Sequence, residues 1–172
     1  MVDDHYEPNV KEHNEKLEKS YKAIKIILNS TIDQKLQREC ILPFLIWSIT
    51  KVDGAKHNVR CWSKEAYNRF QKNKKNKEKL IGIHHEHVMP IKKTINRLFV
   101  ARGDDARIDE ILKKIGACLV TVEEHNKLEK LKKLESYERY KKVKVKILDM
   151  SKVPPKLIDI NKFRKLCKIA VL

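Results

Sequence analysis

The stretch LIGIHHEHVM (residues 80–89) is short, apolar and β-branched near its ends, and it lies between a polar loop and a proline. This combination predicts a strand. Because side chains alternate along a strand, we expect His85 and His87 to face one side, and His84 and Glu86 to face the other. Three histidines and a carboxylate within four positions make the frayed end of this strand the first candidate site.

A second candidate segment is TVEEHNKL (residues 121–128), which follows a short apolar strand predicted at residues 117–120. Thr121 and Glu124 have the spacing of a capping box, so a helix is expected to start here and to carry His125 in its first turn. A carboxylate such as Glu86 can hold a divalent metal beside an imidazole that deprotonates water, and His125 could complete the protein ligands.

The segments EHVMP (residues 86–90) and LVTVEEHNKL (residues 119–128) resemble the HNH, or ββα-metal, nuclease superfamily. In that family a strand ends in an acidic residue or a histidine followed by the histidine base. A second strand and a helix then complete the metal site. The resemblance covers residues 80–134 and implies a ββα-metal core that hydrolyses phosphodiester bonds with one Mg²⁺ or Mn²⁺ per site.

For single residues, the resemblance implies that Glu86 is a metal ligand, that His87 is the general base and that His125 is the ligand from the helix. Four further residues are weaker candidates. Asn96 is the nearest counterpart of the family's middle asparagine, Asn126 could replace His125, Glu129 could add a ligand, and His85 could stack on a neighbour or touch a phosphate. The chain departs from the family in having no CxxC pair for a structural zinc.

Charge points to a polyanionic partner. The chain has 39 basic and 23 acidic residues, a formal net charge of +16, which favours contact with phosphates. The basic run QKNKKNKEK (residues 71–79) leads into the histidine cluster, although such runs are more often solvated loops. The candidate nucleic-acid contacts are Lys72, Lys74, Lys75, Lys77, Lys79, Arg97 and Arg102.

Two other classes of protein have little support. The longest apolar run, residues 40–49, contains Pro43 and is too short for the roughly 18 residues that span a bilayer. The acidic stretch MVDDHYEP (residues 1–8) lacks the apolar segment of a signal peptide, so a cytoplasmic location is expected. The widely spaced cysteines predict free thiols rather than a zinc cage or a disulfide framework, and they are Cys40, Cys61, Cys118 and Cys167.

The whole pattern predicts an α+β fold that is mainly helical, with helices added before the nuclease core and a strand and a helix after it. Helices are expected at residues 9–30, after Ser63, and at 91–100, 106–115 and 161–170. A further helix is expected from Thr31 or Asp33, and Pro43 should either kink it or mark where a new helix begins. A long helix is expected after Thr121, and a strand over 143–148. The expected division is an N-terminal region at 1–79, the core at 80–134 and an extension at 135–172, and the three are expected to form one compact domain.

The leading functional hypothesis is a sequence-specific DNA endonuclease of the restriction or host-defence type. It would act on double-stranded DNA, and a homodimer would match a palindromic site. A nonspecific, toxin or phage nuclease would use the same chemistry. From another class, the chain could be a non-catalytic nucleic-acid-binding protein whose histidine cluster holds a structural metal. A protein of the membrane surface is a remote third hypothesis.

Overall fold

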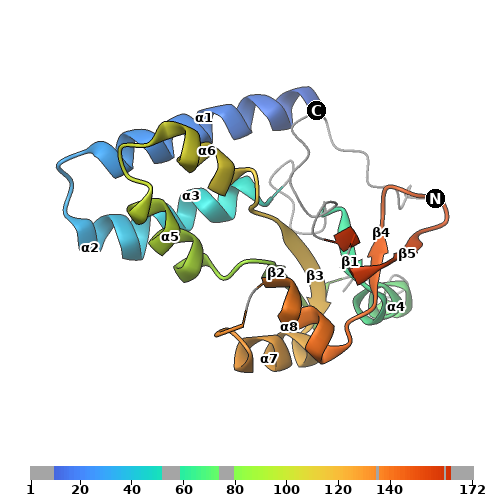
Figure 1. Ribbon diagram of the computed structural model, residues 1–172. Helices are drawn as coiled ribbons and strands as arrows, with labels where there is room; N and C mark the ends of the chain where they lie inside the picture. Colours follow the sequence, from blue (N-terminus) through green and yellow to red (C-terminus); the bar gives the residue numbers. More distant parts are fainter. Residues whose placement is uncertain (1–9, 52–58, 74–79, 135, 161, 164–172) are drawn as a thin grey trace.

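The computed structural model describes residues 10–51, 59–73, 80–134, 136–160 and 162–163. Asp53 and Gly54 predict a turn over residues 53–58, and this segment lies outside the described ranges, as does nearly all of the closing helix expected at 161–170. The residues Lys74, Lys75, Lys77, Lys79 and Cys167 also lie outside them. The described residues form a mainly helical α+β fold, as predicted, in which a helical layer stands beside a mixed sheet (Figure 1).

The helical layer combines segments from both sides of the histidine cluster. It contains α1 (Val10–Asn29), α2 (Gln34–Leu36), the π-helical turn η1 (Gln37–Ile41), α3 (Leu42–Ile49), α5 (Ile91–Val100) and α6 (Asp105–Leu112). The apolar faces of α1, α3, α5 and α6 share one core, with Leu28, Ile46, Leu98 and Leu112 fully buried in it. The helices expected at 91–100 and 106–115 therefore pack against the N-terminal helices.

The predicted interruption at Pro43 is present. Pro43 lies at the start of α3, directly after η1. Proline has no N–H to donate to the carbonyl four residues earlier, so a regular α-helix cannot pass through this position without losing a hydrogen bond. The wider π turn lies where that interruption is expected. Upstream, Asp33 caps α2 by accepting a hydrogen bond from the Leu36 N–H at 3.0 Å.

The sheet has five strands in the order β2-β3-β1-β4-β5. Strands β2 (Ile83–His87) and β3 (Ala117–Thr121) are antiparallel, β1 (Cys61–Ser63) runs parallel to β3, and β4 (Ile147–Asp149) and β5 (Lys156–Ile158) extend the sheet in antiparallel fashion. The remaining helices are α4 (Lys64–Asn73), α7 (Val122–Lys130) and α8 (Ser136–Val143).

Each face of the sheet has its own core. Cys118 and Val120 of β3 pack with Leu128 of α7 and Tyr140 of α8 on one face. Leu119, which lies between Cys118 and Val120 in β3, packs on the other face of the sheet with a cluster that includes Ala66 of α4. The alternation along β3 thus assigns α7 and α8 to one face of the sheet and α4 to the other.

Several predicted elements need correction. The helix after Thr121 ends at Lys130 rather than continuing, and a separate helix, α8, follows. The strand expected over residues 143–148 is mostly wrong, because Val143 ends α8 and the strand begins only at Ile147. Strands β1 and β5 were not expected. Among the described residues, no helix is both long enough and apolar enough to cross a lipid bilayer.

Candidate metal centre

Strand β2 carries the histidine cluster, and its register with β3 decides where each side chain points. His84 pairs with Val120 and Glu86 with Cys118, whereas His85 pairs with Leu119. Directly opposed residues of an antiparallel pair project to the same face. His84 and Glu86 therefore share the face covered by α7 and α8, and His85 and His87 project to the opposite face.

Helix α7 presents His125 to that first face because its start is fixed. The predicted capping box is present: Thr121 Oγ1 accepts from the Glu124 N–H at 3.1 Å, and Glu124 Oε2 accepts from the Thr121 N–H at 2.9 Å. Ser63 at the end of β1 also donates its Oγ hydrogen to Glu124 Oε2, at 2.5 Å. The helix start is thus tied to β3 and to β1, which fixes the position of His125 one residue later.

His84, Glu86 and His125 come together in a cluster that could hold a cation. Each offers one ligand atom, and these atoms all lie within 4.8 Å of one another. His125 Nδ1 is 2.6 Å from Glu86 Oε2, and the imidazole rings of His84 and His125 stack with their centroids 3.7 Å apart. Two imidazoles and a carboxylate are a donor set that binds divalent transition metals.

A buried guanidinium supports the carboxylate from behind. Arg139 of α8 is fully buried, and its Nη2 donates to Glu86 Oε1 at 3.0 Å. The same nitrogen lies 3.1 Å from the backbone carbonyl of His87 and 3.0 Å from that of Val88. Arg139 therefore fixes both the Glu86 carboxylate and the end of β2, while Glu86 Oε2 faces His125.

His87 and His85 lie on the other face and contact the helical layer. His87 Nε2 is 3.2 Å from Thr50 Oγ1, and His85 Nε2 is 3.3 Å from the Thr50 carbonyl oxygen. The burial of the His87 ring lowers its pKa to about 3, and positive charge on His85 and His84 contributes to the same shift. The structure thus does not bring the predicted general base, His87, to the cluster of Glu86 and His125.

The weaker candidate ligands also lie away from the cluster. Asn96 on α5 accepts a hydrogen bond from Arg38 Nη1 at 2.9 Å, and Glu129 is paired with Lys132 at 2.8 Å. Asn126 is exposed on α7. None of these three side chains belongs to the group of His84, Glu86 and His125.

The described candidates for nucleic-acid contact are dispersed. Lys72 is exposed near the end of α4. Arg97 Nη1 lies 3.6 Å from Met89 Sδ, and Arg102 Nη2 donates to the Ser30 carbonyl at 3.0 Å. Lys72 lines a pocket between α4 and α7, and Arg97 lines a different pocket between α5 and α6.

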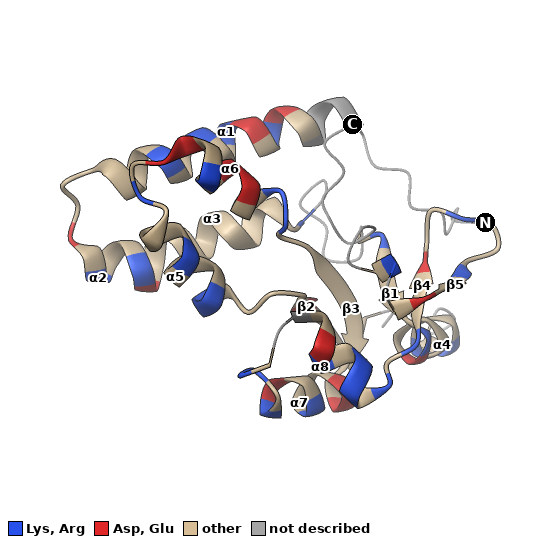
Figure 2. Ribbon diagram, in the orientation of Figure 1, with Lys and Arg blue, Asp and Glu red and all other residues tan. Residues whose placement is uncertain are grey.

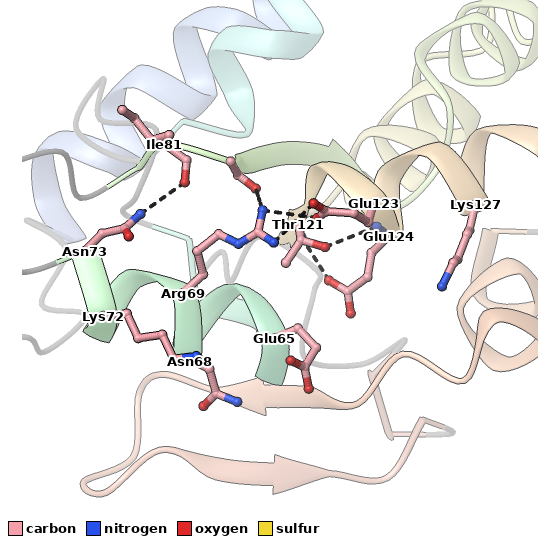
Figure 3. A pocket seen from close by; sticks show the side chains of 11 residues that line it. Glu65, Asn68, Arg69, Lys72, Asn73, Ile81, Thr121, Glu123, Glu124 and Lys127 are labelled. Carbon is pink, nitrogen blue, oxygen red and sulfur yellow. Dashed lines mark hydrogen bonds and ion pairs between the residues drawn. The ribbon is translucent and has the colours of Figure 1, made fainter.

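A pocket lies between α4 and the starts of β2 and α7 (Figure 3), and none of His84, Glu86 and His125 lines it. Arg69 of α4 reaches across it, donating from Nη1 to the Gly82 carbonyl at 3.0 Å and pairing with Glu123 at 3.1 Å. Lys72 and Lys127 lie at its sides, and Figure 3 shows the mixture of acidic and basic groups around it. Gly82 has a φ of 72°, a backbone conformation that favours glycine, and a Cβ at this position would also force the end of the Arg69 side chain to shift.

Sequence reasoning missed two members of the centre. His84 could have been found, because strand alternation places it on the same face as Glu86. Arg139 could not, because it comes from a helix that was not predicted, and an isolated arginine in a Lys-rich segment carries no signal of burial.

Comparison of the chain with models of known protein families, with curated proteins and with solved structures finds no match.

Proposed function

We propose that this chain is a metal-dependent endonuclease that hydrolyses phosphodiester bonds of DNA, with its metal centre at His84, Glu86 and His125. The observation that carries the proposal is the convergence of these three ligand atoms within 4.8 Å from two elements far apart in the sequence. The centre differs from the one expected from the motif. His84 stands where His87 was expected, and Arg139, which the motif does not include, contacts the Glu86 carboxylate.

The donor set favours a transition-metal ion over Mg²⁺. Imidazole nitrogen suits Zn²⁺ and Ni²⁺ best, Mg²⁺ prefers oxygen ligands and keeps several waters, and Mn²⁺ stands between them at the weak-binding end of the transition-metal series. Two of the three donors here are imidazoles. We therefore favour Mn²⁺ over Mg²⁺ among the two ions that the motif implies.

Each residue of the centre has a separate task. A divalent ion in such a site supplies stabilisation of negative charge on the phosphate and a lower pKa of bound water. Glu86 and His125 would hold that ion, and Arg139 keeps the Glu86 carboxylate oriented toward it. His84, stacked on His125, would be the third ligand or the imidazole that accepts the proton of the attacking water.

His87 remains the alternative proton acceptor, as the motif implies, but two observations weigh against it. It faces away from Glu86, and its contact is to Thr50. An imidazole whose pKa is about 3 is also a weak proton acceptor at neutral pH. We assign His87 to the packing between the sheet and the helical layer.

DNA is the proposed substrate because the chain is strongly basic and DNA is a polyanion. The formal net charge of +16 would attract the phosphate backbone and raise the rate of encounter with it. A restriction or host-defence role, with two copies acting on the two strands of a palindromic site, is the biological setting we favour.

A plasmid-cleavage assay tests the proposal. We expect the wild-type chain to nick or linearise supercoiled plasmid with Mn²⁺ and to be inactive in EDTA. Glu86→Gln, which removes the charge but preserves the shape, should be inactive with every ion. Glu129→Gln is the matched control, because Glu129 is exposed on α7 and is not part of the centre. Equal cleavage by wild type and Glu86→Gln would refute the proposal.

A second candidate function rests on the polar contacts of Glu86. Glu86 already contacts both Arg139 and His125, so these groups form a connected polar network without a metal ion. Such a network could serve only to hold α7 and α8 on the sheet of a non-catalytic nucleic-acid-binding protein. Binding of DNA without cleavage under Mn²⁺, Mg²⁺ and Ni²⁺ would favour this function.

A further inference from the structure

A groove between α5 and α6 differs in charge from the pocket between α4 and α7. It has a volume of about 400 Å³, and its charged lining residues are Lys93 and Arg97 of α5, Arg107 and Glu110 of α6, and Lys114 just after α6. Four of these side chains are cationic and one is acidic, and the acidic one, Glu110, pairs with Lys114 at 3.6 Å. The groove therefore carries a large excess of positive charge.

The pocket between α4 and α7 has a different balance of charges. It is lined by three cations, Arg69, Lys72 and Lys127, and by three acids, Glu65, Glu123 and Glu124. Its formal charges cancel, and Arg69 is already paired with Glu123. Binding of a polyanion to this pocket would therefore gain little electrostatic free energy, whereas the groove between α5 and α6 offers a net positive charge to one ligand.

The two helices hold the groove on a rigid base. Ile95 and Leu98 of α5 and Ile108 and Leu112 of α6 are buried in the core of the helical layer. The basic side chains project from the other sides of the same helices. In Figure 2, α5 carries basic segments and no acidic one. Helix positions fixed by a core keep the spacing of their cations, which a flexible basic loop does not.

The groove is also tied closely to the metal centre along the chain. Strand β2 ends at His87, and α5 begins at Ile91 after Pro90. Arg97 reaches back from α5 to Met89, which lies in this connection. A ligand in the groove thus binds a helix that is joined to the end of the strand carrying Glu86.

We propose that this groove binds the sugar–phosphate backbone of the duplex DNA that the metal centre cuts. The proposal rests on the proposed function for its ligand, but it makes a separate claim about where the backbone binds. Lysine and arginine neutralise phosphates and release counterions, so the contribution of each contact depends on salt. The groove would supply such contacts without reading the base sequence.

The experiment compares two double variants with the same change in charge. Lys93→Gln/Lys114→Gln removes two cations that line the groove. Lys92→Gln/Lys113→Gln is the control, because these exposed lysines are the immediate neighbours of the first pair and do not line it. Binding to a short fluorescein-labelled DNA duplex is measured by anisotropy in EDTA over a series of salt concentrations, so that neither metal nor cleavage enters the result.

We expect the groove variant to bind the duplex at least about tenfold more weakly than wild type at low salt. The slope of log K against log salt should fall by about 0.9 for each phosphate that is no longer neutralised, or about 1.8 in all. The control should stay within about threefold of wild type and keep its slope. Equal weakening of both variants would mean that only total charge matters, and this would overturn the proposal, as would binding unchanged in both.

A third variant tests the same groove in case the Lys93→Gln/Lys114→Gln variant does not fold. Arg107 is exposed in the first turns of α6, so Arg107→Gln should leave the fold intact and still lower the slope by about 0.9. An unchanged slope in this variant would also overturn the proposal. The two proposals can be refuted separately. If the groove variants weaken DNA binding but the wild-type chain does not cleave DNA, the proposed nuclease function is wrong. If the wild-type chain cleaves DNA but the groove variants bind it as wild type does, the proposed role of the groove is wrong.

Discussion

His125 Nδ1 lies 2.6 Å from Glu86 Oε2, although the two residues are 39 positions apart in the chain. The contact joins the end of β2 to the first turn of the helix that follows β3. It depends on the capping box at Thr121 and Glu124, which fixes where α7 begins, and on the register of β2 with β3. A shift of one residue in either element would point Glu86 or His125 away from the other.

Substitution of His84 and His87 separates the two candidates for the proton-accepting or third ligating imidazole. We expect His84→Ala to lower plasmid cleavage by about 10²–10⁴-fold, the usual contribution of a positioned acid or base. His87→Ala should retain Mn²⁺ affinity within about threefold, because His87 faces Thr50 rather than Glu86. Cleavage rates and calorimetric Mn²⁺ titrations measure both effects.

The opposite pattern would reverse the two roles. If His84→Ala cleaved like wild type while His87→Ala were inactive with Mn²⁺ affinity intact, the base would be His87, as the motif implies. The assignment of His84 to the centre would then be wrong.

Removal of Arg139 should destabilise the protein strongly. Its guanidinium is fully buried and contacts the buried Glu86 carboxylate, so Arg139→Met would leave an uncompensated charge. The loss of one partner of a buried ion pair typically costs about 3–5 kcal/mol. Urea unfolding measures this loss. Lys142→Met on the exposed side of the same helix should change the free energy of unfolding by less than about 0.5 kcal/mol. Similar stabilities of the two variants would contradict the packing of α8.

Asp149 should give the fold a component of stability that is lost in acid. Burial alone would raise the pKa of Asp149, but hydrogen bonds from Arg60 and Ser151 outweigh it and lower the pKa to about 2. Because the unfolded chain binds the proton more tightly, the stabilisation is complete above a pH of about 4 and declines as the pH falls toward about 2.

Asp149→Asn should therefore be less stable than wild type at neutral pH, by on the order of 1–2 kcal/mol, and the difference should shrink between about pH 4 and pH 2. Denaturant unfolding at a series of pH values measures it. Asp105→Asn, at a position whose side chain is 64% exposed, is the control and should show almost no difference. A difference independent of pH would mean that the Arg60–Asp149 pair does not set this pKa.

Local signals in the sequence predicted much of the fold. The capping box at Thr121, the start of a new helix near Pro43 and a strand within residues 80–89 depend on interactions within a few positions. The structure confirms the capping box, places the start of α3 at Leu42 and confines the strand to Ile83–His87. Strand β1 (Cys61–Ser63) was missed because three residues give no measurable alternation, and its pairing with β3 is purely tertiary.

The candidate site was predicted in part for the same reason. Strand alternation alone separates Glu86 from His87, yet the motif groups them as neighbours, and the register of the sheet follows the alternation. The burial of Arg139 under Glu86 depends on α8 folding back onto the sheet, which no local pattern in residues 136–143 indicates.

A calorimetric titration of the wild-type chain with Mn²⁺ tests the central claim most directly. We predict one bound Mn²⁺ per chain. We also predict that His84→Ala, Glu86→Gln and His125→Ala each weaken Mn²⁺ binding by more than about 100-fold. Loss of a residue that only hydrogen-bonds to a ligand typically weakens metal binding by roughly 10–100-fold, and loss of a ligand itself should cost more. Glu129→Gln should bind as wild type does. No binding by the wild-type chain, or the same affinity in all three variants as in wild type, would contradict the existence of a metal centre at His84, Glu86 and His125.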